Sequence, residues 1–212
     1  MTVRIQVYSD FICPWCYIGE RRLTAALASL PEAIDCNLNW LPFELNPTMP
    51  PEGMARRDYR SAKFGSWQNS LIADARTIET ARDDDIVFNY DRIARTPNTF
   101  MTHRLVWYVT GQQRRQMLIE RIFRGYFTDG LDIGRVDVLI ELAEAAGVDR
   151  TATSRFLSSE RGNTEVRQKQ QTGLASGISG VPYFIIGNQT LAGAQPVAVL
   201  RQAIEAGQRC SD

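Results

Sequence analysis

Apolar and polar residues alternate along residues 3–8 near the start of the chain. This period of two predicts a strand with one buried face. Pro14 suits the first turn of a helix, and apolar residues then recur at helical spacing over residues 17–30, just before Pro31. A second alternating stretch at residues 34–43 predicts another strand, which ends in a proline-rich segment. The chain is therefore expected to begin as strand, helix, strand.

Helical spacing dominates the middle of the chain. Trp67, Leu71, Ala75 and Ile78 form one apolar stripe, which predicts a helix at that place. By the same criterion, further helices are expected at about residues 97–110, 114–127, 135–146, 149–158 and 163–176. The pattern then returns to strands at residues 183–186 and up to Leu191, followed by a last helix at about residues 196–206.

The composition is that of an ordinary globular protein. Of the 212 residues, 44% are hydrophobic, and 24 Lys and Arg balance 24 Asp and Glu, so no net charge attracts nucleic acid or an anionic membrane. We expect neither as a partner. No apolar segment approaches the roughly 20 residues that span a bilayer. The first residues also lack a basic stretch followed by a long apolar one, which predicts no signal peptide and a cytoplasmic location.

Two cysteines separated by two residues occupy the predicted junction of the first strand and helix. Disulfide exchange needs an accessible thiolate that attacks and a nearby thiol that resolves the mixed disulfide, and Cys13 and Cys16 meet this requirement. The positive end of the helix favours a thiolate at Cys13, so we assign Cys13 as nucleophile and Cys16 as resolving thiol. Pro14 and Trp15, between the sulfurs, are expected to contact substrate and to tune the reduction potential.

A structural zinc site is the alternative interpretation of this spacing. Tetrahedral zinc needs about four ligands, usually with a second pair at similar spacing. Cys36, His103 and Cys210 are isolated in the sequence, so we expect no metal centre. Cys36 itself lies at an apolar position of the second predicted strand, where it is expected to serve as a small buried hydrophobic residue.

A second motif strengthens the redox interpretation. Within residues 179–184, Pro182 heads a predicted strand after a glycine-rich turn. One interpretation is that Pro182 simply marks the start of the strand and has no role in catalysis. Together with the cysteine pair, the motif favours a cis Val181–Pro182 bond, which would present the Val181 backbone to an extended substrate and keep metal ions away from the thiols.

Several segments match one family pattern and together extend over nearly the whole chain. They are SDFICPWCYIG at 9–19, FELNP at 43–47, NT at 98–99 followed by HRL at 103–105, FTDGLDI at 127–133, GVP at 180–182 and GAQP at 193–196. In these segments the chain resembles the DsbA-family oxidoreductases of FrnE type.

The resemblance implies a thioredoxin-like fold interrupted by a helical domain, with the cysteine pair and the cis-proline loop facing each other at the domain boundary. We therefore predict an α/β protein whose thioredoxin-like domain comprises residues 1–47 and 160–212, with an inserted all-helical domain of residues 48–159. Kappa-class glutathione transferases and 2-hydroxychromene-2-carboxylate isomerases are similar, but they usually have serine at the first cysteine position. The presence of both Cys13 and Cys16 favours the redox members.

Other polar residues are weaker candidates. In the resemblance, Asn98 and His103 face the active site from the inserted domain, so they are expected to line the substrate cleft, although a lone histidine more often serves packing. Asp10 and Glu44 are candidate acidic neighbours of the sulfurs, where thioredoxin-like sites often place a proton acceptor; a solvated charge is an equal alternative.

These features predict a cytoplasmic thiol–disulfide oxidoreductase that acts on protein or small-molecule thiols and disulfides through its Cys-Pro-Trp-Cys motif. No metal or organic cofactor is expected, glutathione is a candidate redox partner, and both a monomer and a homodimer are compatible with the sequence. A glutathione-dependent transferase or isomerase is the enzyme alternative. A metal-binding or chaperone-like module with a hydrophobic surface around Trp15 is the alternative that is not an enzyme.

Overall fold

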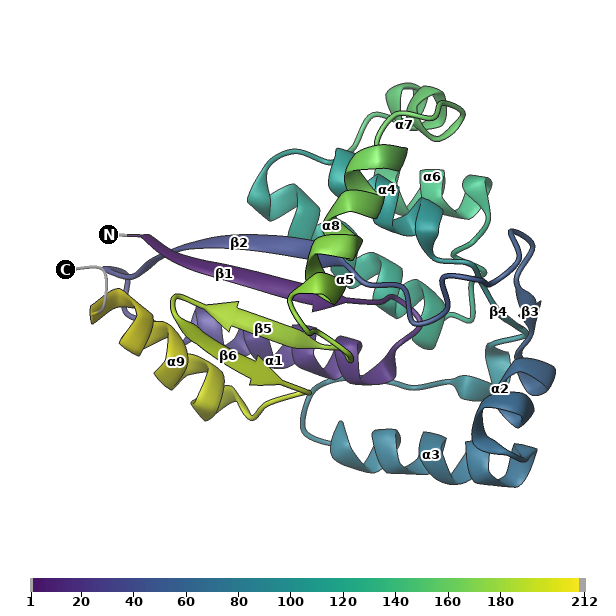
Figure 1. The fold of residues 1–212 in the computed structure, drawn as a ribbon, viewed down its shortest axis with the longest axis horizontal. Helices are drawn as coiled ribbons and strands as arrows, with labels where there is room; N and C mark the ends of the chain where they lie inside the picture. Colours follow the sequence, from purple (N-terminus) through teal and green to yellow (C-terminus); the bar gives the residue numbers. More distant parts are fainter. Residues whose placement is uncertain (1, 210–212) are drawn as a thin grey trace.

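A computed structural model describes residues 2–209, so Cys210 lies outside the described part of the chain. Within it, one sheet has four strands in the order β2-β1-β5-β6 (Figure 1). Strand β1 pairs in parallel with β2 and antiparallel with β5, which pairs antiparallel with β6. The strands of this sheet are β1 (Thr2–Ser9), β2 (Asp35–Pro42), β5 (Tyr183–Ile186) and β6 (Gln189–Ala192).

The helices and two short strands complete the fold. The helices are α1 (Pro14–Ala28), α2 (Arg56–Phe64), α3 (Trp67–Thr80), α4 (Phe100–Tyr108), α5 (Gln112–Phe127), α6 (Val136–Ala145), α7 (Arg150–Leu157), α8 (Asn163–Ala175) and α9 (Val197–Arg209). A 3-10 turn, η1 (Tyr90–Arg92), precedes β4 (Arg95–Thr96), which pairs with β3 (Met54–Ala55). Over residues 2–209, no helix is both long and apolar enough to cross a membrane. The mixed α/β architecture expected from the sequence is confirmed.

Helices cover both faces of the sheet. Val3 and Tyr8 differ by an odd number of positions along β1, so their side chains point to opposite faces. A Cβ atom on Gly207 of α9 would come within 3.1 Å of Val3, and one on Gly173 of α8 within 2.5 Å of the Tyr8 ring. Helix α9 therefore packs on one face, together with α1, and α8 packs on the other.

The buried apolar residues join the sheet to the helices of the middle segment. Phe11, next to the cysteine motif, and Tyr17 of α1 pack against Phe123 of α5, with ring centroids 5.1 and 5.3 Å apart. These residues belong to one hydrophobic cluster that also contains Ile5 of the sheet and Leu139 of α6. The division at residues 47 and 160 into two domains stays a prediction, and the core is shared between the two parts.

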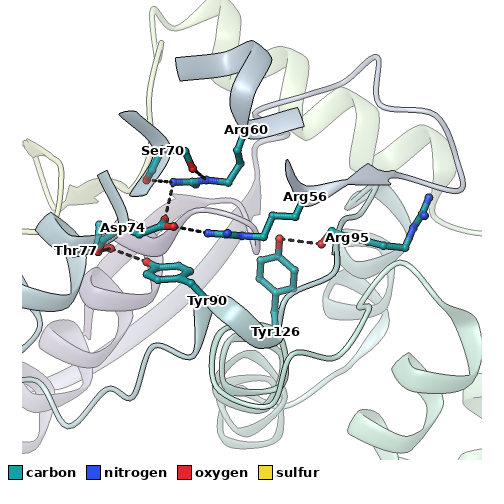
Figure 2. A network of polar contacts seen from close by, with 8 residues as sticks. All are labelled: Arg56, Arg60, Ser70, Asp74, Thr77, Tyr90, Arg95 and Tyr126. Atoms are coloured by element: carbon teal, nitrogen blue, oxygen red, sulfur yellow. Dashed lines mark hydrogen bonds and ion pairs between the residues drawn. The ribbon is translucent and has the colours of Figure 1, made fainter. Parts of the chain in front are cut away.

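Helix α3 forms where the apolar stripe predicts it, but it buries the opposite, polar face. Ser70, Asp74 and Thr77 are buried, whereas Leu71 is 39% and Ile78 50% exposed. A polar face can be buried when its groups find hydrogen-bond partners, and neighbouring elements supply them here (Figure 2). The expectation of a helix is correct, and the usual inference that its apolar stripe faces the core is wrong.

A buried carboxyl group lies in the core beneath the sheet. Glu20, one turn after Cys16 on α1, is 2% exposed and accepts hydrogen bonds from Thr24 and Gln116. Burial raises the pKa of Glu20 to about 7, although these hydrogen bonds and Arg21 lower it. Because the unfolded chain ionises this group near its ordinary pKa of 4.5, folding is favoured most at acid pH.

The stability of the protein is expected to fall as the pH rises from about 4.5 to about 7. Glu20 binds a proton in the folded chain over this range and has lost it in the unfolded chain, so its contribution, up to about 3 kcal/mol, is lost. Glu20→Gln should remove this slope in chemical-denaturation measurements between pH 4 and pH 8, whereas Glu144→Gln, a half-exposed control that is not among the groups acting on Glu20, should keep it. An equal slope in parent and Glu20→Gln would contradict the assignment.

Candidate active site

The cysteine motif lies at the N-terminal end of α1. Cys13 is the N-cap residue, Pro14 occupies the first turn, and no acidic residue is present in that turn. The backbone N–H groups of Cys16 and Tyr17 donate to the Cys13 carbonyl, at 3.0 and 3.3 Å. The free N–H groups and the dipole of α1 therefore act on a sulfur at the start of the helix, an arrangement that stabilises thiolates in general.

The loop before β5 lies against the Cys13 sulfur. The Val181–Pro182 peptide bond is cis, and the Cys13 thiol donates to the Val181 carbonyl oxygen at 3.5 Å. Gly19 of α1 allows this close approach, because a Cβ atom there would come within 3.0 Å of the Pro182 ring. Cys13 and Val181 are 168 positions apart in the sequence, so two distant segments of the chain meet at the Cys13 sulfur.

The two cysteine thiols have different surroundings. Cys16 is fully buried, and burial raises the pKa of its thiol well above the ordinary value, with a further increase from the neighbouring Cys13. Contacts from the Asp10 backbone and from Ser9 offset only part of this effect. Cys13 is 4% exposed, and it borders a cavity that Cys16 does not reach. Small reagents therefore have access to Cys13 first.

Polar residues are buried behind the motif. Asp10 is fully buried and accepts a hydrogen bond from the Leu45 backbone, while its other oxygen lies 3.4 Å from His103 Nε2. This contact is within ion-pair distance, but neither atom has a hydrogen bond of good geometry among the described residues. Burial and the charge of Asp10 raise the pKa of Glu44, and His103 lowers it. Asp10 and Glu44 are therefore buried here and not solvated charges.

A cavity of about 290 Å³ opens beside Cys13. Pro14, Trp15 and Val181 border it together with Cys13, as does Leu45 from the segment after β2. The remaining wall comes from α2, α3, η1 and the end of α5; it includes Arg56, Tyr59, Arg60, Lys63, Phe64, Asp74, Tyr90 and Tyr126. The cavity thus lies between the cysteine motif and the helical segment.

Comparison with known proteins identifies the family. Residues 4–205 match the DSBA-like thioredoxin domain. The chain belongs to this family. The family resemblance and the thioredoxin-like fold expected from the sequence are thereby confirmed. Membership supports activity as a thiol–disulfide oxidoreductase or a related isomerase.

Individual relatives of this DSBA-like chain share its whole length. It is 28% identical to the uncharacterized protein YwbO of Bacillus subtilis over 210 residues, 99% of each chain. A probable DsbA oxidoreductase from Streptomyces coelicolor is 27% identical, with a TM-score of 0.86 over 98% of this chain and 90% of that one. The cytosolic disulfide reductase DsbM from Pseudomonas aeruginosa, 19% identical, shares the fold with a TM-score of 0.67 over 98% and 99% of the chains.

Asn98 and His103 lie away from the cavity of this DSBA-like protein. The Asn98 amide donates to the Met49 carbonyl at 2.6 Å and accepts from the Phe100 backbone, so it holds two loops together and borders a separate pocket beside Glu44. His103 is 5% exposed and packs on Phe11. The expectation that both line the cleft beside Cys13 is corrected, because backbone contacts and packing occupy them. Pro182 packs against Gly19 of α1 and is not among the residues that border the cavity.

Cys36, the third cysteine of the described residues, lies outside the site. Cys36 is half-buried in β2 and packs at the margin of the core, where burial raises its pKa. Over residues 2–209, no three His, Cys, Asp or Glu side chains are grouped so that they could hold a metal ion.

The cationic wall of the cavity was not anticipated from the sequence. It comes largely from α2, in which Arg56 is the single buried residue and charged side chains predominate. An apolar period is therefore absent, and that period is the main signal of a helix. The available signal was weaker: Arg56, Arg60 and Phe64 recur at intervals of four, the spacing of one helix face.

Proposed function

We propose that this protein is a thiol–disulfide oxidoreductase in which Cys13 attacks and Cys16 resolves. The observation that carries the proposal is the unequal environment of the two sulfurs. Cys13 borders the cavity and contacts the Val181 carbonyl at 3.5 Å, while Cys16 is fully buried one turn further along α1. An attacking thiol needs access, and a resolving thiol needs only proximity to the first sulfur.

The exchange proceeds in two steps. The Cys13 thiolate attacks a substrate disulfide, forms a mixed disulfide with one sulfur and releases the other as a thiolate. Cys16 then loses its proton and attacks the Cys13 sulfur, which forms the Cys13–Cys16 disulfide and releases the second substrate thiol. The raised pKa of Cys16 keeps its proton in place until this second step. The reverse sequence oxidises a substrate dithiol.

The residues around Cys13 would position the substrate. Pro14, Trp15 and Val181 border the cavity, and Pro182 packs against Gly19 and keeps the Val181 carbonyl at the sulfur. The substrates we propose are thiols and disulfides. We keep the predicted arrangement of a thioredoxin-like domain with an inserted helical domain, residues 48–159, as part of this proposal. The cytoplasmic location stays a prediction.

A glutathione-dependent transferase is the second candidate, because proteins of the same superfamily catalyse such reactions. In it, Cys13 would hold or activate glutathione without forming a disulfide with Cys16. The two candidate enzymes convert glutathione into different products. An oxidoreductase reduces a disulfide substrate to thiols while two glutathione molecules are oxidised to glutathione disulfide, and a transferase joins the glutathione sulfur to an electrophile as a thioether and releases the leaving group.

The proposed function is tested by offering reduced glutathione together with either hydroxyethyl disulfide or chlorodinitrobenzene. We expect catalysed reduction of the disulfide and no catalysed formation of the aromatic thioether. Zinc is measured on the same sample, with less than about 0.1 equivalent expected, because tetrahedral zinc needs about four ligands. Thioether formation without disulfide turnover, or one equivalent of zinc that is released when Cys13 and Cys16 are replaced, would overturn the proposal.

A further inference from the structure

The cavity beside Cys13 contains more positive than negative side chains. Helix α2 contributes Arg56, Arg60 and Lys63 to its wall. Asp74 of α3 is the single acidic side chain in the described wall. The formal charge of the wall is therefore positive even after Asp74 has neutralised one arginine.

Two guanidinium groups share the one carboxylate (Figure 2). Arg56 Nη2 and Arg60 Nη2 lie 2.6 Å from Asp74 Oδ2 and Oδ1. Arg60 also donates to the Ser70 hydroxyl and carbonyl, at 2.6 and 3.1 Å, so it is well satisfied. Burial lowers the pKa of Arg60, but an arginine stays protonated at neutral pH. One carboxylate cannot neutralise both cations, and a buried positive charge remains.

Arg56 carries this excess charge. It is 5% exposed, and its guanidinium stacks between the Trp67 and Tyr90 rings, 5.4 and 5.1 Å from their centroids. Its side chain makes one hydrogen bond among the described residues, to Asp74, although a guanidinium has five N–H donors. Buried cations with unused donors are costly unless an anion pairs with them. Arg56 borders the cavity, so an anion that enters there can reach this guanidinium.

The remaining wall suits a small molecule with an apolar part. Trp15 and Phe64 line the cavity, and a volume of about 290 Å³ is near the lower limit of small-molecule sites. The two phenol groups in the network are already engaged: Tyr90 bonds to Thr77, and Tyr126 donates to the Arg95 carbonyl. The polar groups left for a ligand are therefore the arginine donors and, beside them on α2, Lys63, which donates to the Tyr59 hydroxyl at 3.1 Å.

We propose that Arg56, with Arg60 and Lys63, binds the carboxylate of a small thiol or disulfide whose sulfur lies at Cys13. This inference rests on the proposed function and adds the chemical class of its substrate. Arginine suits the role because its planar fork matches a carboxylate. In the first step, the Cys13 thiolate bonds to the near sulfur of the disulfide, and the far sulfur leaves as a carboxylate-bearing thiolate.

Three disulfides that differ in charge test this site. Reduced protein is mixed with dithiodipropionate, hydroxyethyl disulfide or cystamine, which are anionic, neutral and cationic, and each second-order rate constant is divided by that of free mercaptoethanol. At low salt, the anionic disulfide is expected to exceed the neutral one by about tenfold and the cationic one by more, because charge complementarity accelerates association. The preference should weaken as salt is added.

Variants then assign the preference to the arginine cluster. Arg56→Gln should remove most of the preference for the anionic disulfide, since Arg60 and Asp74 then form a balanced pair and Lys63 is the one cation left over in the described wall. Lys63→Gln should reduce it partly and Arg56→Lys should retain most of it, and both provide a test if Arg56→Gln fails to fold. Arg95→Gln is the matched control, because this guanidinium points away from Arg56 and Asp74 in Figure 2, donates to the Glu52 carbonyl, and is not part of the described cavity wall. If the cluster served only to stabilise the Cys13 thiolate, Arg56→Gln would lower the rates with all three disulfides equally. This result would overturn the inference.

Calorimetry separates this inference from the proposed function. In Cys13→Ser, which cannot exchange disulfides, dithiodipropionate should bind more tightly than hydroxyethyl disulfide, and Arg56→Gln in that background should remove most of the difference. If the parent exchanges no disulfide while this preference is found, the proposed function fails and the anion site stands. If the parent exchanges disulfides but shows no charge preference in rate or in binding, the proposed function stands and the anion site alone is overturned.

Discussion

Cys13→Ser is expected to lower disulfide turnover by at least about 1000-fold, because a serine hydroxyl is not ionised near neutral pH and cannot form a mixed disulfide. Cys16→Ser should stop the reaction one step later. Cys13 still attacks, but the protein has no second thiol at the site to release the product. Without excess added thiol, mixed disulfides therefore accumulate on Cys13 and multiple turnover falls by about 100-fold or more. Steady-state rates and intact-mass measurements of the trapped adducts distinguish the two variants.

Cys36→Ser serves as the control for both cysteine variants, because Cys36 lies half-buried in β2 outside the cavity. Its turnover should stay within about twofold of the parent. Glutathione as the sole adduct of Cys16→Ser would favour the transferase alternative, whereas adducts of proteins or other small thiols favour an exchanger. Parent-like turnover in Cys16→Ser, or the same adducts formed through Cys36 or Cys210 when Cys13 and Cys16 are both serine, would contradict the assignment.

Phe123→Ala is expected to reduce the free energy of unfolding by about 3 to 5 kcal/mol, the cost of removing a fully buried aromatic side chain and leaving a cavity. Phe123 packs against Phe11, Tyr17 and Phe127, so the substitution affects the contact between α5 and the segment that carries the cysteines. Because one apolar cluster extends through both parts of the chain, the variant should still unfold in a single transition at lower denaturant.

Leu174→Ala is the control for this prediction. Leu174 is 50% exposed at the end of α8, so its truncation should change the free energy of unfolding by no more than about 0.5 kcal/mol. Equilibrium denaturation followed by circular dichroism and by tryptophan fluorescence measures both variants. Two separate transitions, with only one of them shifted by Phe123→Ala, would show that the helical segment and the sheet have independent cores.

The sheet and most helices could be predicted because their burial follows a simple period. β1 alternates along Val3, Ile5 and Val7, and α5 places Leu118, Ile122 and Phe123 on one face. The cysteine motif and the loop at Pro182 were recognisable because both depend on short sequences with specific backbone requirements.

The helical wall of the cavity could not be predicted, because there the buried groups are polar. Arg56 and Asp74 are buried as a pair, and each is acceptable in the interior only because the other is present. Hydrophobic periodicity contains no information on such pairs, so α2 was not predicted and the apolar stripe of α3 did not indicate which of its faces is buried. Asn98 and His103 were misplaced for a related reason, since a resemblance indicates that a segment approaches the site but not which backbone groups occupy its side chains.

The most direct test of the account is a redox titration of the parent protein. The protein is equilibrated in thiol–disulfide buffers, free thiols are alkylated, and peptides are identified by mass. We predict one two-electron transition that converts Cys13 and Cys16 together into a linked peptide, with a midpoint between roughly −270 and −120 mV, while Cys36 stays alkylated throughout. If no Cys13–Cys16 disulfide forms at any buffer ratio, or if Cys36 is oxidised in its place, the central claim is contradicted.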